Sequence, residues 1–172
     1  MLKYFVTETY VKDETPILLN VDFKTLAPWM KTAAETRVKN ILGRNFYAYL
    51  LQKYNDEDLS TLEQELCDQI RPVVAWYGAS LAIPDTNKKL GNKGQQRQQG
   101  QFTTPVQDID EIRGIDQYAS TGRHYLNELK LFLVENGVNY PQYTAEQNQK
   151  SDGFKDAKQN EELGYNDSIL II

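Results

Sequence analysis

The chain has 172 residues, of which 19 are basic and 24 acidic, giving a net charge of −5. Hydrophobic residues make up 40% of it, enough for the modest core of one domain. One cysteine and one histidine exclude an intrachain disulfide, a multi-cysteine zinc site and a paired-histidine metal motif. The apolar runs are far shorter than the roughly 20 residues that cross a bilayer, so we expect a soluble protein without membrane contact.

Residues 1–20 alternate loosely between apolar and polar side chains and are interrupted at Pro16. This pattern predicts an extended N-terminal arm with one or two short strands. No second strand follows nearby in the sequence, so the arm should pair with a distant segment or with another chain. The contact residues expected on it are Tyr4, Phe5, Val6 and Tyr10.

Two helices are predicted next, over about 22–42 and 45–54. Asp22 is a candidate N-cap, Pro28 should reset or kink the first turn, and Gly43 stands where a helix-ending glycine is expected. Apolar residues recur at helical spacing in both segments. They are Met30, Ala34, Val38, Ile41 and Leu42 in the first, and Phe46, Tyr47, Leu50, Leu51 and Tyr54 in the second.

A third and a fourth long helix follow. The residues Ser60-Thr61-Leu62-Glu63 form a capping box that opens the third, which should kink at Pro72 and end at Ile83-Pro84. The fourth is predicted over about 108–136, with Asn136-Gly137 at its end. The expected apolar stripes are Leu62, Leu66, Ile70, Val73 and Tyr77 in the third helix, and Tyr118, Tyr125, Leu129, Phe132 and Leu133 in the fourth. The expected fold class is therefore mainly α: a small bundle of about four helices in a core over residues 21–143, with extended N- and C-terminal arms.

Residues 85–105 are strongly polar and rich in glycine and glutamine, which predicts a projecting loop or a long β-hairpin. The positive charges of this segment are Lys88, Lys89, Lys93 and Arg97. Such a loop can contact DNA phosphates without reading sequence, or it can contact an acidic protein surface. The alternative is a solvated hairpin without a role of its own.

Residues 144–172 are rich in polar and charged side chains and end in an apolar run. This predicts a C-terminal tail that becomes ordered on a partner, with β-branched residues suited to strand addition. The expected docking residues are Phe154, Leu163, Tyr165, Ile169, Leu170, Ile171 and Ile172.

Catalytic chemistry finds little support in the sequence. The glycines of 91–100 match neither a phosphate-binding loop nor a dinucleotide fingerprint. His124 follows Ser120 and Thr121, but a histidine on a helix surface is the preferred interpretation. A dyad of Cys67 with His124 would require the fold to bring them together. We therefore expect no catalytic residue, no metal site and no cofactor.

The arrangement of these helices resembles the head–tail connector, or adaptor, proteins of tailed phages, most closely those of crAss-like and related Bacteroides phages. The resemblance covers about residues 20–143. It lies in the opening helix Ala33–Gly43 followed by Phe46–Leu50, the apolar helix Pro72–Pro84, the polar excursion, and a final helix closing with Phe132-Leu133 and Tyr140-Pro141.

The resemblance implies a non-enzymatic virion protein made in the host cytoplasm. In that family a small helical bundle forms a ring, usually of twelve subunits, below the portal protein; DNA passes through the lumen. A C-terminal extension commonly docks onto the portal, and adjacent tail or ring proteins are further partners. The alternative is a soluble helical binding module, a tail-completion or regulatory factor that does not form a ring.

Overall fold

The computed structural model describes residues 3–17, 21–91, 94–97, 108–145 and 147, with side chains described outside 84–112. The fold is mainly helical, as predicted. Its elements are α1 (Glu8–Glu14), α2 (Phe23–Ala33), the π-helical segment η1 (Ala34–Val38), α3 (Lys39–Leu42), α4 (Arg44–Asn55), α5 (Thr61–Asn87), β1 (Lys88–Gly91), β2 (Gly94–Arg97), α6 (Asp108–Asn136) and the 3-10 turn η2 (Gly137–Asn139).

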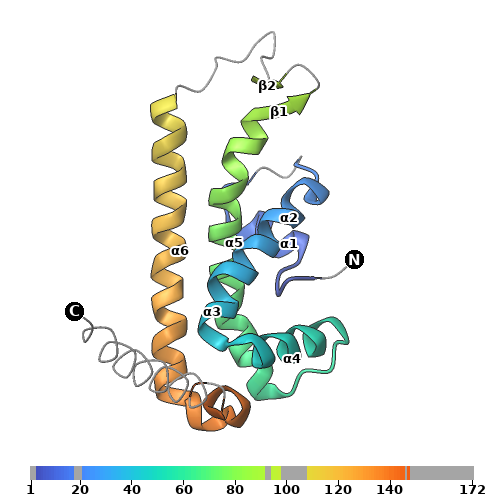
Figure 1. Cartoon of the computed structure of the whole chain (residues 1–172), viewed down its shortest axis with the longest axis vertical. Helices are drawn as coiled ribbons and strands as arrows, with labels where there is room; N and C mark the ends of the chain where they lie inside the picture. Colours follow the sequence, from blue (N-terminus) through green and yellow to red (C-terminus); the bar gives the residue numbers. More distant parts are fainter. Residues whose placement is uncertain (1–2, 18–20, 92–93, 98–107, 146, 148–172) are drawn as a thin grey trace, which may run out of the picture.

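The two longest helices, α5 and α6, lie side by side and run in opposite directions (Figure 1). The strands β1 and β2 pair antiparallel at the end where α5 finishes and α6 begins. On its other side α5 packs against α2 and α1. The helix α5 is therefore the central element, covered by the N-terminal helices on one side and by α6 on the other.

Local sequence signals set several helix boundaries. The Asp22 carboxylate accepts a hydrogen bond from the backbone N–H of Lys24 (2.9 Å), so the predicted N-cap of α2 is confirmed. The capping box before α5 is also confirmed: the Ser60 N–H donates to Glu63 Oε2 (2.7 Å), and the Glu63 N–H donates to Ser60 Oγ (3.3 Å). Between α3 and α4 the chain turns at Gly43, whose φ of 89° suits glycine.

The predicted apolar stripes supply most of the core. In the first two predicted helices Met30, Ala34, Val38, Leu42, Phe46, Tyr47, Leu50 and Tyr54 are buried. In the two long helices the buried positions include Leu66, Ile70, Val73, Tyr77, Leu129 and Leu133. Leu62 departs from the prediction, because its side chain is 43% exposed at the first turn of α5.

The N-terminal segment corrects the prediction of an extended arm. Residues 8–14 form α1, and Phe5 is fully buried, with its ring against those of Tyr47 (5.7 Å between centroids) and Tyr54 (5.5 Å). Two hydrogen bonds between Lys3 and Asn55 hold the start of the described segment on α4 (2.8 and 3.0 Å). The apolar residues read as an alternating strand therefore belong to the chain's own core.

Two helix predictions also need correction. The helix α5 does not stop at Pro84 but continues to Asn87, directly before β1. The helix predicted over 22–42 is not uniform, since five of its residues form the π-helical segment η1. A π-helical turn contains more residues than an α-helical one, so it shifts which positions of the following turns face the core.

Candidate interaction surfaces

The two residues considered for catalysis lie in different environments. Cys67 is completely buried in α5, and burial raises the pKa of its thiol to about 12. A thiol with that pKa is protonated at neutral pH and is a poor nucleophile. His124 is exposed on α6. The structure does not bring them together as a dyad.

Other functional chemistry is also missing from the described part of the chain. Among the residues that the structure describes, no group of three or more histidine, cysteine, aspartate or glutamate side chains is arranged to hold a metal ion. Nor does any described helix have the length and apolar character needed to cross a membrane.

The predicted basic loop is described in part. Lys88 and Lys89 lie on β1 and Arg97 lies on β2, while Lys93 falls outside the described residues. In the antiparallel register Lys88 is opposite Arg97. Two positive residues thus occupy one cross-strand position at the end of the α5–α6 pair.

The predicted tail docking residues, Phe154, Leu163, Tyr165 and Ile169–Ile172, all lie outside the described residues. The beginning of this segment is placed, however. The side-chain amide of Gln147 donates a hydrogen bond to the carbonyl oxygen of Ile41 (2.9 Å), and the ring of Tyr143 lies 6.2 Å from that of Phe46. The chain therefore leaves the described structure beside α3 and the first turn of α4.

The N-terminal contact residues are engaged within the chain. Phe5 and Val6 are buried, and Tyr4 and Tyr10 are partly buried against the core. Residues of the N-terminal segment and of α2 line a pocket of about 360 Å³ that is open to solvent. Phe5 and Val6 therefore pack in the core of their own chain, and Tyr4 and Tyr10 keep part of their surface exposed.

An apolar stripe is exposed at the C-terminal end of α6. The exposed fraction is 55% for Leu131 and 81% for Val134, both on α6. It is 85% for Val138, which lies in the 3-10 turn η2 that follows α6. Leu131 and Val134 lie three positions apart on α6 and therefore on one side of that helix, and Val138 follows them in η2. Exposed apolar side chains in a row are typical of a surface that meets another protein.

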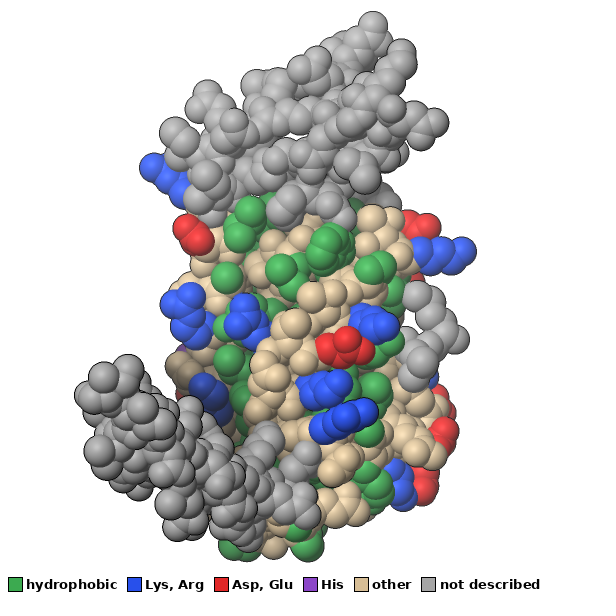
Figure 2. Space-filling model, in the orientation of Figure 1, with side chains coloured by type: hydrophobic (Ala, Val, Ile, Leu, Met, Phe, Trp, Pro, Cys, Tyr) green, Lys and Arg blue, Asp and Glu red, His purple; other side chains and the backbone are tan. Residues whose placement is uncertain are grey.

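A second surface carries positive charge. Between Phe23 and Arg44 the sequence has five Lys or Arg residues and one acid, Glu35, although the whole chain is negative. Lys and Arg side chains gather in the middle of the face shown in Figure 2, where α2, η1 and α3 lie. A concentration of one charge sign on one face favours an acidic partner.

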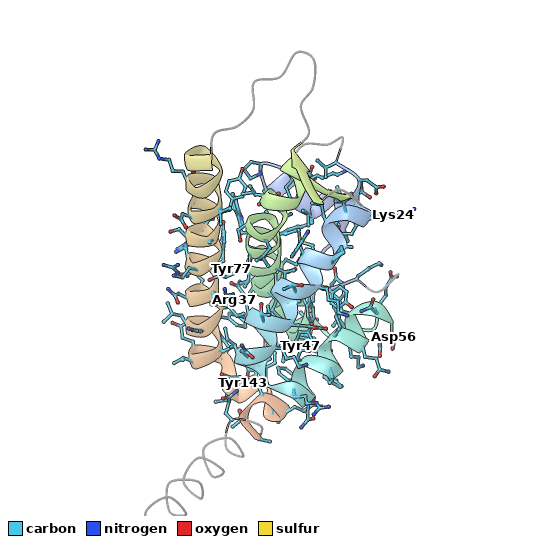
Figure 3. All side chains as sticks on the ribbon, turned by 45° about the horizontal axis from the view of Figure 1, so that its top comes forward. Lys24, Arg37, Tyr47, Asp56, Tyr77 and Tyr143 are labelled. Atoms are coloured by element: carbon cyan, nitrogen blue, oxygen red, sulfur yellow. The ribbon has the colours of Figure 1, made fainter. Side chains whose placement is uncertain are left out.

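Aromatic rings, rather than carboxylates, lie beneath two of these cations. The Arg37 guanidinium is 4.7 Å from the centroid of the Tyr77 ring, and the two residues lie next to each other in Figure 3. The Lys39 ammonium is 5.9 Å from the centroid of the Tyr47 ring. Cation–π contacts of this kind hold a positive side chain in place without neutralising it.

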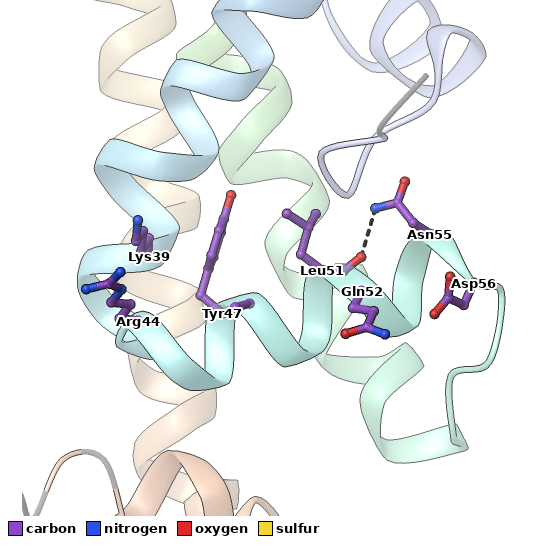
Figure 4. A pocket seen from close by; sticks show the side chains of 8 residues that line it. Lys39, Arg44, Tyr47, Leu51, Gln52, Asn55 and Asp56 are labelled. Atoms are coloured by element: carbon purple, nitrogen blue, oxygen red, sulfur yellow. Dashed lines mark hydrogen bonds between the residues drawn. The ribbon is translucent and has the colours of Figure 1, made fainter.

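A groove adjoins the positive surface at the start of α4. Its volume is about 420 Å³. Figure 4 shows Lys39 and Arg44 at one end of it and Asp56 at the other. The lining residues are Lys39, Arg44, Tyr47, Ala48, Leu51, Gln52, Asn55 and Asp56. Next to the positive end the lining is mainly apolar, from Tyr47, Ala48 and Leu51, and the amides of Gln52 and Asn55 follow toward Asp56.

Sequence reasoning missed this groove and the positive surface. The charge imbalance between Phe23 and Arg44 was visible in the sequence and could have indicated the surface. The groove depends on how α3 turns into α4 at Gly43, which helical spacing does not reveal.

The described part of the chain is thus a mainly helical protein with an exposed apolar stripe on α6, a positive surface on α2 to α4 and a groove beside α4. Residues 38–153 match the model of a family described as "Family of unknown function (DUF6712)". This match covers more than half of the chain, and the protein therefore belongs to that family. No curated protein and no solved structure matches the chain.

Proposed function

We propose that the protein is a structural subunit of a phage head–tail connector ring, located at the head–tail junction of the virion. In this role it joins the portal protein to adjacent tail or ring proteins and surrounds the DNA channel. It acts by binding, without catalysis and without a cofactor. The proposal rests on the sequence resemblance described above and on the distribution of contact surfaces over the helices.

One observation carries the proposal most directly. The α5–α6 pair has the β1–β2 hairpin at one end and the exposed stripe of Leu131, Val134 and Val138 at the other. A subunit in a stack of rings needs one contact surface toward the layer above and another toward the layer below. A pair of long helices with different surfaces at its two ends meets that need.

Side-to-side contacts would complete the ring. Subunits that meet through two different surfaces, head to tail, form a closed ring when the rotation between them closes. The positive surface of α2 to α4 would provide one side of such a contact, and an acidic surface of the neighbouring subunit would be complementary to it. The lysines of β1 would approach the channel or the next layer, where contact with DNA needs no base recognition.

Negative-stain microscopy with mass determination on the purified chain, at several concentrations and with candidate portal protein, tests the proposal. Rings of about a dozen subunits, alone or on the portal, are the expected result. A monomer that ignores the portal would contradict the connector role and favour a binding module without ring assembly.

Removal of residues 144–172 gives a second test. We expect loss of portal binding with the folded core retained, because the tail is the proposed docking segment. Circular dichroism and thermal unfolding would report the state of the core. Unchanged portal binding would contradict docking through the tail.

A further inference from the structure

The groove beside α4 has unneutralised positive charge at one end. Within the described residues, neither Lys39 nor Arg44 forms an ion pair with a carboxylate; the recorded ion pairs involve Lys3, Lys12, Lys31, Lys53 and Arg71. Helix α4 has Gly43 at its N-cap and no acidic residue in its first turn. The positive end of the helix dipole therefore adds to the charge of the two side chains.

The part of the groove next to its positive end favours apolar groups. Ala48 and Leu51 lie about one turn apart on α4, and the ring of Tyr47 borders them. Ala48 is exposed and Leu51 is half-buried. A peptide that fits the groove should therefore carry acidic residues next to apolar ones.

The chain contains such a peptide beyond Gln147. From residue 159 to residue 172 there are three acidic residues, Glu161, Glu162 and Asp167, and no Lys or Arg. Leu163 follows the two glutamates directly, and Tyr165 lies two positions further on. The same segment thus matches both the positive end of the groove and the apolar lining next to it.

The position of Gln147 brings this segment within reach. Its side chain donates a hydrogen bond to the carbonyl oxygen of Ile41 in α3. Ile41 lies three positions before Arg44 in the sequence, so Gln147 is close to the positive end of the groove. The residues between Gln147 and Glu161 can span up to about 45 Å when extended, whereas all of α4 is only about 18 Å long. A tethered segment also has an effective concentration in the millimolar range, so a weak contact is enough for docking.

We propose that residues 161–172 dock into the α4 groove of their own chain, with Glu161 and Glu162 at Lys39 and Arg44. Leu163 and Tyr165 then cover Ala48 and Leu51. This inference goes beyond the connector role and does not depend on it. If the tail also binds a portal, it must first leave the groove. Intrachain docking and portal binding would then compete for the same segment.

Disulfide cross-linking in the full-length chain tests the docking. The double variant Ala48→Cys with Leu163→Cys should form an intrachain disulfide on mild oxidation at least tenfold faster than a control pair, Ser120→Cys with Leu163→Cys. Ser120 is also exposed on a helix but lies on α6, away from the groove. Cys67 is completely buried and stays unreactive in both variants. Equal rates, or a disulfide only between two chains, would overturn the proposal.

Charge reversal tests the recognition itself. In the cross-linking variant, Arg44→Glu should slow the intrachain reaction about 5- to 30-fold, and adding Glu161→Lys with Glu162→Lys should restore it. The matched control is Lys130→Glu, which makes the same change at an exposed site on α6. Equal effects of Arg44→Glu and Lys130→Glu would overturn the assigned site. The cross-link is measured on the free subunit, so a failure to form rings leaves its result intact.

Discussion

The Tyr140 hydroxyl donates a hydrogen bond to the backbone carbonyl of Leu62 (2.9 Å), joining positions that are 78 residues apart. Tyr140 follows α6 and η2, whereas Leu62 lies in the first turn of α5. The Tyr140 ring also lies 6.2 Å from the rings of both Phe46 and Phe132. One side chain thus connects the ends of α5 and α6 to the start of α4.

Removal of this hydroxyl should weaken the fold. We expect Tyr140→Phe to lower the free energy of unfolding by about 1 kcal/mol, because the hydrogen bond to Leu62 is lost while the ring packing remains. Denaturant unfolding followed by circular dichroism measures the change. A variant as stable as the wild type would show that water replaces the bond without loss.

The same substitution at Tyr47 should not lower the free energy of unfolding. The Tyr47 hydroxyl is buried and has no hydrogen-bond partner within the described structure. Burial also raises its pKa well above the usual range for tyrosine. We expect Tyr47→Phe to leave the free energy of unfolding unchanged or raise it by about 1 kcal/mol. Tyr140→Phe is the matched control, and an equal loss in both variants would contradict the assignment.

Gly122 allows α6 to approach α5. A Cβ atom at this position would lie 2.9 Å from Cδ2 of the Tyr77 ring, which is too close for a normal contact. We expect Gly122→Ala to lower the free energy of unfolding by about 1–3 kcal/mol, since the strain exceeds the gain in helix propensity. Gly114→Ala is the control on the same helix: its Cβ would meet Ile83 Cδ1 at 3.8 Å, an ordinary contact. That variant should gain up to about 1 kcal/mol.

The buried thiol predicts a loss of stability at high pH. Burial raises the pKa of Cys67 from the ordinary 9.0 to about 12, so the folded state favours the neutral thiol. This stabilisation is complete below pH 9 and is lost as the pH rises toward 12. Over that window the free energy of unfolding of the wild type should fall more steeply than that of Cys67→Ala, by at most about 1.4 kcal/mol per pH unit. Parallel pH profiles would contradict this cause.

A substitution in the exposed stripe on α6 should affect assembly without affecting the stability of the fold. Val134 is 81% exposed, so Val134→Lys should change the free energy of unfolding by no more than about 0.5 kcal/mol. If the stripe is an interface between ring layers, the same variant should abolish assembly onto the portal, because a charge would be buried there. The control is Asn127→Lys, at an exposed polar position of α6. Normal assembly of Val134→Lys would remove the stripe from the interface.

The helices were predictable because their signals are local. Asp22 and the Ser60–Glu63 capping box act within one turn, and the apolar spacing of α2 to α6 identified most buried residues. The N-terminal segment was not predictable in this way. Its alternating pattern suits a strand, but the burial of Phe5 between Tyr47 and Tyr54 depends on residues more than forty positions away.

The surfaces were harder to predict than the helices. The exposed stripe of α6 and the buried stripe beside it have the same spacing, so the sequence does not tell which one meets the core. The π-helical turn Ala34–Val38 was also hidden, since Ala34 and Val38 fit an ordinary helix equally well. The groove beside α4 depends on how α3 turns into α4 at Gly43, and so it could only be found in three dimensions.

The central position of α5 has a consequence for synthesis on the ribosome. Once residues up to Asn87 have emerged, α2 can already cover one side of α5, but the side that packs on α6 has no cover. That apolar side stays open to water until α6, residues 108–136, has emerged as well. Nascent chains on the same messenger RNA are then most able to associate with one another. The order of translation thus exposes the centre of the molecule before its last helix exists.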